Sequence, residues 1–200
     1  MKKVILAAIA VMAFGFANAQ DVKFGLKGGI NLSRFSGDIE DASSKIGFQV
    51  GGFAEFKLTD KFSIQPELLY STQGAKFEES EVNYFYKEKI NTNYLNVPVM
   101  AKYYVASKFS VEAGPQIGFL LSAKDKWEEM YYGEKNSGTD DAKDDIKSVS
   151  FGLNVGAGYD FTENVSVGVR YNFGLSNISD FDSDAKIHNN VVSLSVGYKF

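Results

Sequence analysis

The feature that most constrains this chain is a strict alternation of apolar and polar residues that recurs along its whole length. It is clearest at the C-terminus, where one parity is apolar and the other is small or polar. The apolar parity is Val192, Leu194, Val196, Tyr198 and Phe200, and the polar parity is Ser193, Ser195, Gly197 and Lys199. A period of two residues is that of a β-strand with one apolar and one polar face. Such a strand buries its apolar face against a second sheet or against lipid.

Seven further segments alternate in the same way, so eight strands are predicted. Their ranges are 22–33, 47–58, 62–74, 92–104, 109–123, 148–161, 165–175 and 191–200. Each is long enough for the roughly 9–11 residues that a transmembrane β-strand needs. The links between them alternate in length, as do the short periplasmic turns and longer extracellular loops of outer-membrane barrels. Both termini of the mature chain are therefore expected on the periplasmic side.

The pattern predicts an all-β fold, an eight-stranded antiparallel up-and-down β-barrel in the outer membrane of a Gram-negative bacterium. The last strand must pair with the first, because an open sheet edge does not survive in lipid. The alternative is a soluble lipocalin-like barrel, which has the same strand number but an apolar interior. The predicted inner face instead carries charged residues, among them Lys27 and Arg170. A charged lining favours the membrane barrel.

The N-terminus has the pattern of a cleaved signal peptide. Lys2 and Lys3 precede an apolar run from Val4 to Phe16, and Ala17-Asn18-Ala19 provides a small-residue cleavage site. We expect residues 1–19 to be removed and residues 20–200 to form one barrel domain. The chain has no cysteine, so neither a lipid-anchored cysteine nor a disulfide is expected.

The charge of the chain bears on its partners. The formal net charge is −4, which argues against nucleic acid. The partners expected are outer-membrane lipid, the barrel-assembly machinery, and an unidentified envelope or surface protein. The aromatic residues that end the chain, Tyr198 and Phe200, are the predicted assembly signal for that machinery.

Three stretches resemble the PorT-like family of outer-membrane β-barrel proteins. They are SIQPELLY from Ser63 to Tyr70, YLNVPVMAKY from Tyr94 to Tyr103, and VEAGPQIG from Val111 to Gly118. The resemblance implies a β-barrel in the outer membrane. One branch of the family assists a protein-secretion system, and no residue of this chain identifies that branch. The resemblance therefore implies a fold and a location, and no particular activity.

Charged residues on the predicted inner faces form the main candidate site. They come from five strands and lie three to six residues from the nearest short turn: Glu55, Glu67, Lys102, Glu112 and Arg170. At about 3.3 Å per residue they share a layer on the order of 10 Å thick in the periplasmic half. An eight-stranded barrel is just wide enough for its own side chains. We therefore predict a plug of paired charges. An ion or proton path is the alternative, and acid/base catalysis would need substrate access that this layer denies.

Prolines occupy three consecutive predicted strands, at Pro66, Pro98 and Pro115. A proline inside a closed sheet usually marks a β-bulge, because it lacks the N–H that the ladder needs. We therefore predict three bulges that shape the barrel. The alternative is a lateral weak point through which an apolar molecule passes between lumen and lipid, as in a transporter of small hydrophobic molecules.

The last predicted loop holds the remaining candidates for chemistry. His188 is the sole histidine, but no serine stands in a distinctive setting, so no catalytic residue is predicted and a lipid hydrolase is a minor alternative. Asp180, Asp182 and Asp184 are weak candidates for a divalent cation, and the positions that an EF-hand loop requires hold the wrong residues. No metal or cofactor is therefore predicted. We expect a structural or interaction protein rather than an enzyme.

The third predicted loop is acidic and contains three large aromatic residues. Trp127, Tyr131 and Tyr132 are predicted to anchor this loop at the membrane interface, as aromatic belts do. Contact with a partner protein is the alternative.

Overall fold

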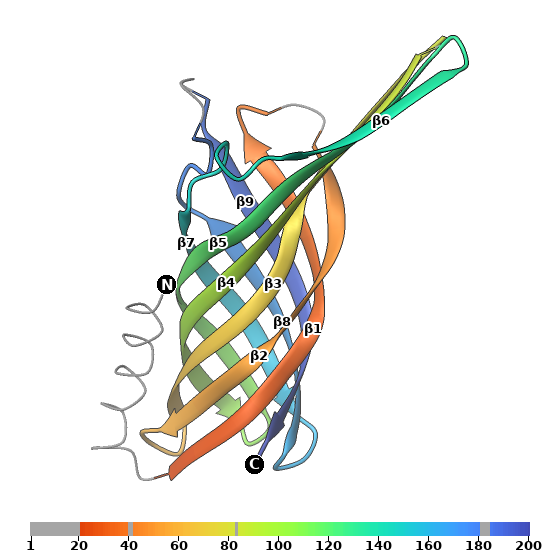
Figure 1. The fold of residues 1–200 in the computed structure, drawn as a ribbon. Coiled ribbons are helices and arrows are strands. Elements are labelled where there is room, and N and C mark those ends of the chain that lie inside the picture. The colour runs from red at the N-terminus through yellow and green to blue at the C-terminus, as the bar shows by residue number, and fades with distance from the viewer. Residues whose placement is uncertain (1–20, 40–41, 83, 181–184) are drawn as a thin grey trace.

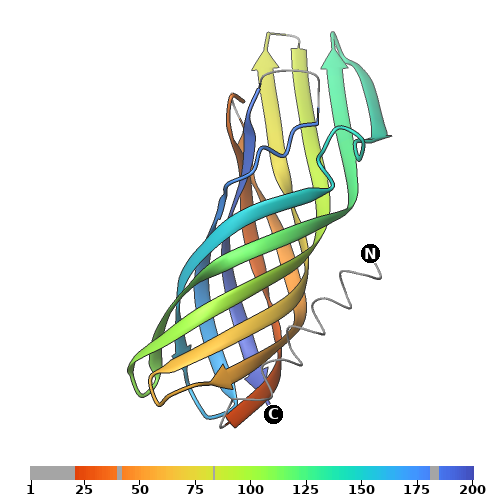
Figure 2. The same ribbon diagram turned by 90° about the vertical axis from the view of Figure 1, so that its left-hand side faces the viewer.

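The computed structural model describes residues 21–39, 42–82, 84–180 and 185–200, which form a tall, twisted cylinder of strands (Figures 1 and 2). The predicted signal peptide, residues 1–19, lies outside the described residues. No helix among the described residues is long and apolar enough to cross a membrane. The strands are β1 Asp21–Gly37, β2 Ser43–Lys57, β3 Phe62–Glu81, β4 Tyr84–Ala106, β5 Phe109–Tyr131, β6 Glu134–Asp141, β7 Val149–Asp160, β8 Val165–Gly174 and β9 Ile187–Lys199.

Eight of these strands close into a ring. Their order is β4-β3-β2-β1-β9-β8-β7-β5, and β4 pairs with β5 to complete the circle. The final strand pairs with the first from Gly25↔Lys199 to Gly37↔Ile187. Every neighbouring pair is antiparallel, so the chain runs up and down around the barrel. The predicted fold class is confirmed.

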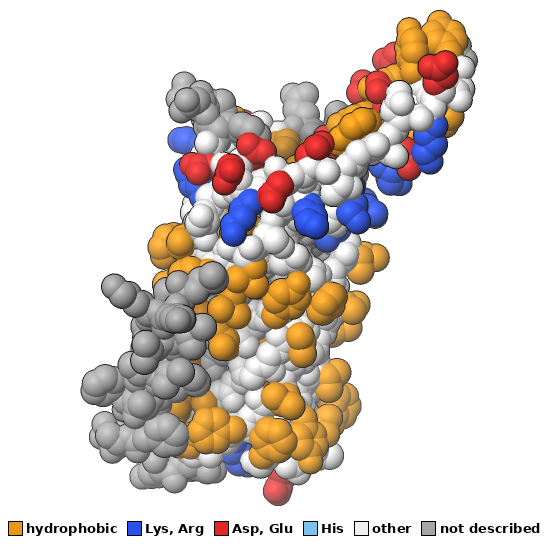
Figure 3. Space-filling model, in the orientation of Figure 1, with side chains coloured by type: hydrophobic (Ala, Val, Ile, Leu, Met, Phe, Trp, Pro, Cys, Tyr) orange, Lys and Arg blue, Asp and Glu red, His pale blue; other side chains and the backbone are white. Residues whose placement is uncertain are grey.

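The outer surface carries the apolar parity of the strands. Ile30, Val50 and Leu194 are each more than half exposed, which has a physical basis only where lipid replaces water. Figure 3 shows hydrophobic side chains over the visible face of the barrel wall, and we call this apolar surface the belt. Aromatic side chains edge the belt, with Phe48 and Phe151 towards the long loops and Tyr159, Phe161, Tyr198 and Phe200 towards the short turns. Two aromatic girdles of this kind are typical of outer-membrane barrels.

Two of the predicted long links prove to be mostly strand. The β3–β4 ladder continues without a break to Glu81↔Tyr84, although residues 75–91 are expected to form a loop. Residues 124–147 hold the end of β5 and all of β6, which pair from Lys124↔Asp141 to Tyr131↔Glu134. These segments are charged on both faces. Charge therefore does not exclude a strand where both faces of the sheet are outside the lipid.

Together these extensions form what we call the projecting sheet, made of residues 76–81, 84–91, 124–131 and 134–141. It rises from one side of the barrel and leans away from the barrel axis (Figures 1 and 2). Its β5–β6 turn consists of Tyr132 and Gly133, whose φ angles are 46° and 88°. Two positive φ angles in a two-residue loop define a type I′ turn, whose twist matches that of the flanking strands. The sequence Tyr-Gly conceals this turn because tyrosine rarely takes a positive φ.

The prolines do not mark bulges, so the predicted explanation for them is wrong. Around Pro66 the pairs Phe53↔Glu67 and Phe56↔Ile64 keep one register, and β4–β5 likewise keeps one register across Pro98. The register shifts instead between Ser44 and Gln49, between Asn93 and Tyr94, and between Tyr104 and Ala106. The prolines gather around Val99, which pairs with Pro66, follows Pro98 and faces Pro115 in the β4–β5 register. Each proline removes one backbone N–H donor from the ladder but inserts no extra residue into the strand.

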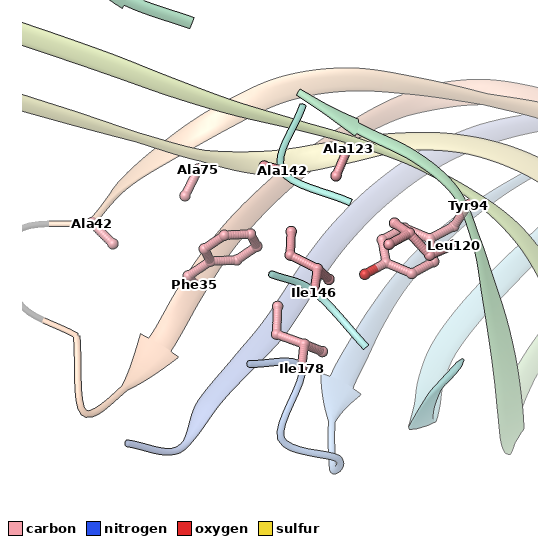
Figure 4. Packing of buried hydrophobic residues seen from close by; sticks show 9 residues of the cluster. All are labelled: Phe35, Ala42, Ala75, Tyr94, Leu120, Ala123, Ala142, Ile146 and Ile178. Carbon is pink, nitrogen blue, oxygen red and sulfur yellow. The ribbon is translucent and has the colours of Figure 1, made fainter. Parts of the chain in front are cut away.

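The hydrophobic core of the described residues lies at the extracellular mouth rather than inside the membrane-spanning barrel. Figure 4 shows side chains from several strands and from the segments after β6 and β8 meeting there. The cluster comprises Phe35, Ala42, Ala75, Tyr94, Leu120, Ala123, Ala142, Ile146 and Ile178. It closes the top of a lumen whose other side chains are mostly polar, with Phe53, Leu69 and Met100 among the buried apolar ones.

Candidate functional site: the lumen and its outer mouth

Arg170 on β8 lies at the centre of the charged layer. Its Nη1 and Nη2 each donate to one carboxylate oxygen of Glu67 at 2.9 Å, a two-pronged contact with the opposite wall. Its Nε donates to Glu112 Oε1 at 2.9 Å. The Glu67 side chain has no exposed surface, and those of Arg170 and Glu112 are buried. Two-pronged arginine–carboxylate contacts fix geometry as well as charge.

Two further groups complete the shell around Glu67. Lys27 Nζ contacts Glu67 Oε1 at 2.6 Å, and Gln65 Nε2 donates to the same oxygen at 2.6 Å. Glu67 thus joins β1, β3 and β8 across the lumen. Lys27 was assigned to the inner face by its parity but was not among the predicted members of the charge network.

A second group surrounds Glu55, nearer to the short turns. Lys199 Nζ lies 2.9 Å from Glu55 Oε2, Lys102 Nζ lies 3.6 Å from Oε1, and the Tyr104 hydroxyl donates to Oε1. Lys199 also reaches Asp160 at 3.3 Å. Since Lys102 donates to Gln65 Oε1 at 3.1 Å, one amide side chain connects the two groups.

The combined set, which we call the lumen charge network, is balanced. It holds four cations, Lys27, Lys102, Arg170 and Lys199, and four carboxylates, Glu55, Glu67, Glu112 and Asp160. The structure brings together all five predicted residues and adds three. Each added residue has inward parity, so alternation alone was able to place it. Which carboxylate meets which cation depends on contacts across the barrel, and alternation carries no information about those.

The lumen is open at its periplasmic end and filled above it. A vestibule of about 640 Å³ lies between the short turns and is lined by Glu55, Tyr104, Asp160 and Lys199 among others. A cavity of about 30 Å³ lies beside the network, and one of about 10 Å³ lies among the amides higher up. A single water needs about 10–15 Å³ by such a measure, so these spaces admit a water or two and no hydrated ion.

Uncharged polar side chains fill the lumen between the network and the mouth. Asn172 donates to Asn154 at 3.1 Å, Asn154 donates to Gln116 at 3.2 Å, and Asn189 donates to Gln73 at 2.6 Å. Amides carry both donors and acceptors, so they satisfy one another without excess charge. These amide side chains were not predicted to form a layer of their own.

At the extracellular mouth a pocket of about 350 Å³ combines an apolar lining with carboxylates. Phe35, Phe77 and Ile90 form part of the lining, and Asp125 and Glu88 stand beside them. Burial, followed by the nearby charges of Glu88 and Asp140, raises the pKa of Asp125 to about 6. Asp125 Oδ1 is buried and has no hydrogen-bond partner among the described residues. This pocket was not predicted, because residues 75–91 and 124–147 have the charged composition of loops.

The other predicted residues are dispersed. His188 Nδ1 lies 3.1 Å from the backbone oxygen of Ser176 rather than from a serine hydroxyl. The Asp180 backbone N–H donates to Asp145 O, while Asp182 and Asp184 lie outside the described residues. No group of three or more metal-binding side chains occurs in the described part of the chain. The rings of Tyr198 and Phe200 lie 5.6 Å apart and are largely exposed, in the periplasmic girdle.

The aromatic residues of the third loop do not lie in the lipid belt, so the predicted interface anchor is wrong. Tyr131 and Tyr132 stand at the tip of the projecting sheet, far from the barrel (Figure 1). Trp127 Nε1 donates to Asp140 at 2.8 Å, and its ring covers Gly138, where an added Cβ would lie 2.7 Å from the ring. All three residues therefore lie on the projecting sheet, beyond the lipid-facing wall of the barrel.

Comparison with known proteins identifies one family and several similar structures. Residues 18–180 match the family described as outer membrane protein beta-barrel domain. The structure of Neisserial surface protein A is similar, with a TM-score of 0.51 and 13% sequence identity over 90% of this chain and 100% of that one. Ail of Yersinia pestis has a TM-score of 0.47 and 13% identity over 90% of this chain and 100% of that one. OprG of Pseudomonas aeruginosa has a TM-score of 0.45 and 14% identity, over 92% and 98%. No curated protein matches the chain.

Proposed function

The chain belongs to the outer membrane protein beta-barrel domain family, and we propose that within it this protein is a closed barrel of structural or interaction type. It resides in the outer membrane, with its long loops extracellular. The observation that carries the proposal is the filled lumen. Eight charges neutralise one another across the barrel, and amides fill the space above them.

The projecting sheet is the surface we assign to the interaction. The face that bears Tyr86, Glu88, Asp125 and Trp127 is turned towards the barrel mouth, as the packing of Ile90 against the mouth cluster indicates. Aromatic and acidic side chains alternate there, a composition suited to a basic envelope or surface protein. Residues at the tip, Tyr131 and Tyr132, are mostly exposed.

Planar-bilayer recording tests the closed lumen. The purified barrel should conduct little or no current, because no continuous water path fits among the lumen side chains. A known open porin reconstituted in the same lipid serves as the control for insertion. Large, steady single-channel currents from this protein would contradict the proposal.

A second candidate is a lateral transporter of small hydrophobic molecules. The mouth pocket of about 350 Å³ favours it, as do the three donors lost around Val99. The unshifted register beside each proline weighs against it, since the ladder resumes at once.

The proline triple variant separates these two candidates. Replacing Pro66, Pro98 and Pro115 with alanine restores three N–H donors to the ladder. We expect uptake of an apolar fluorescent probe into the lumen to be unchanged, because the prolines only shape the wall. A marked loss of uptake in the triple variant, with unfolding temperature unchanged, would favour transport.

The finer identity is also a proposal. The three stretches that resemble PorT-like proteins support membership of the PorT-like family, with no secretion role attached. We further propose that residues 1–19 are cleaved and that the protein is not an enzyme. The contact of His188 with a backbone oxygen supports the absence of a serine–histidine pair.

A further inference from the structure

The two faces of the projecting sheet carry opposite charge. Directly opposite residues in an antiparallel ladder point to the same face, so the registers sort the side chains. Ala75, Ile90 and Asp125 form one row, on the side that packs over the barrel mouth. Their chain neighbours Lys76, Lys89 and Lys126 form the next row, on the other side.

This second row, which we call the lysine row, is unusual. Lys76 pairs with Lys89 and Lys89 pairs with Lys126, so three like charges stand side by side on three adjacent strands. Like charges placed directly opposite one another destabilise a sheet. Hydroxyl residues continue the row at both ends, since Ser43 pairs with Lys76 and Lys126 pairs with Thr139.

The nearest carboxylates form their short ion pairs with lysines outside the lysine row, although Glu78 is also attracted electrostatically by Lys76 and Lys89. One step towards the tip, Glu78 is bound to Lys87 at 2.6 Å, and Glu128 is bound to Lys135 at 2.7 Å. One step towards the barrel stand Asn91 and Lys124, with Asp141 beside the latter. No ion pair is formed by Lys76, Lys89 or Lys126 with the described residues. The row thus concentrates positive charge that an external anion would neutralise.

The lysine row lies on the side of the sheet that continues the lipid-facing wall. Below it on that wall, Tyr70, Leu95 and Phe119 form an apolar row. Figure 3 shows basic side chains as a band between the apolar belt and the acidic side chains above. The lysines therefore face outward over the membrane, not over the lumen.

The height of the row selects the kind of headgroup. Six residues separate Tyr70 from Lys76 on β3. At about 3.3 Å per residue and a tilt near 45°, this is about 14 Å above the apolar row. A simple phospholipid headgroup layer is only about 5–7 Å thick. A headgroup with phosphorylated sugars extends further from the hydrocarbon.

We propose that the lysine row, Lys76, Lys89 and Lys126 with Ser43 and Thr139 at its ends, binds the phosphate groups of a glycolipid in the outer leaflet. Lysine ammonium groups bind phosphate oxygens as point charges, and hydroxyl groups donate further hydrogen bonds. Binding would hold the projecting sheet down on the membrane and turn its acidic, aromatic face towards the outside. This proposal concerns the opposite face from the one assigned to a protein partner, so either can fail alone.

The test uses the full barrel in nanodiscs of neutral phospholipid to which a lipopolysaccharide core glycolipid is added, either phosphorylated or dephosphorylated. The test variant is Lys76→Gln/Lys89→Gln/Lys126→Gln. The control variant, Lys143→Gln/Lys147→Gln/Lys186→Gln, removes the same charge from loop positions that form no ion pair with the described residues. A basic residue near an anionic surface contributes about fivefold to affinity, so the test variant should bind the phosphorylated glycolipid about a hundredfold more weakly. The control should lose far less.

Each possible outcome either supports or overturns the proposal. Preference for the phosphorylated glycolipid that falls with added salt and is lost in the test variant supports the proposal. Equal losses in the two variants would reduce the effect to net charge and overturn it, as would equal binding of the dephosphorylated glycolipid. Full competition by millimolar inorganic phosphate would mean that the row binds free phosphate rather than lipid, and would also overturn it. Hydrogen exchange of the projecting sheet shows whether the test variant is folded.

Discussion

In the periplasmic half of the lumen, each charge of the network lies against an opposite charge from another strand, whereas on the projecting sheet three lysines stand side by side. Glu67 meets Arg170 from the far wall, but Lys89 stands between two other lysines. Burial explains the difference. A charge inside the barrel has little water around it, so it requires an internal partner. A charge on the sheet is solvated and therefore remains available for something outside the chain.

The same strands carry both arrangements, so chain position alone does not decide the role of a charge. On β3, Glu67 is buried in the network and Lys76 stands nine residues further along, outside the lipid belt. The lumen charges contribute to closing the barrel, and the sheet charges offer two surfaces of opposite sign.

The largest expected effect comes from a substitution in the lumen charge network. Arg170→Ala leaves Glu67 and Glu112 buried with less than their full charge complement. Removing one partner of a buried ion network typically costs ~3–5 kcal/mol, and we expect a loss of this size in the free energy of unfolding. Chemical unfolding in detergent micelles measures it.

The matched control lies on the projecting sheet. Lys135→Ala removes the partner of Glu128, a pair whose side chains are 58% and 41% exposed. An exposed pair contributes ~0–1 kcal/mol, so stability should barely change. Similar losses in the two variants would show that the lumen is as well hydrated as the outer surface.

A smaller effect is expected in the projecting sheet, whose stability should depend on pH. The folded sheet raises the pKa of Asp125 from 3.8 to about 6, so the folded state holds this proton more tightly than the unfolded segment does. Stability of the projecting sheet should therefore fall as pH rises from about 4 to above 6. Hydrogen exchange of residues 84–91 and 124–131, corrected for the intrinsic pH dependence, should be severalfold faster at pH 7.5 than at pH 5.

Asp125→Asn sharpens this test because it removes the titrating group while keeping the side-chain shape. The variant should lose most of the pH dependence and exchange slowly at both values. The membrane-spanning strands provide an internal reference and should not change. An unaltered pH dependence in the variant would assign the effect to another group of the mouth pocket.

Much of the fold follows from the sequence, for a simple reason. A strand alternates its side chains with a period of two, and lipid outside a polar lumen forces that period on every spanning strand. Alternation therefore indicated eight spanning strands, the pairing of the first with the last, and the inward direction of Glu55, Glu67, Lys102, Glu112 and Arg170. The same rule applied more widely would have included Lys27 and Lys199.

The rest depended on contacts between strands that no single strand encodes. Outside the lipid both faces of a sheet tolerate charge, so the sequence could not distinguish the projecting sheet from loops. A proline looks the same in the sequence whether the strand register shifts beside it or the ladder only loses one N–H donor. The alternation fixed which way Lys76, Lys89 and Lys126 point on their own strands. Only the register of three strands placed them side by side, because register is set by pairing across the whole barrel and not by the order of residues along one strand.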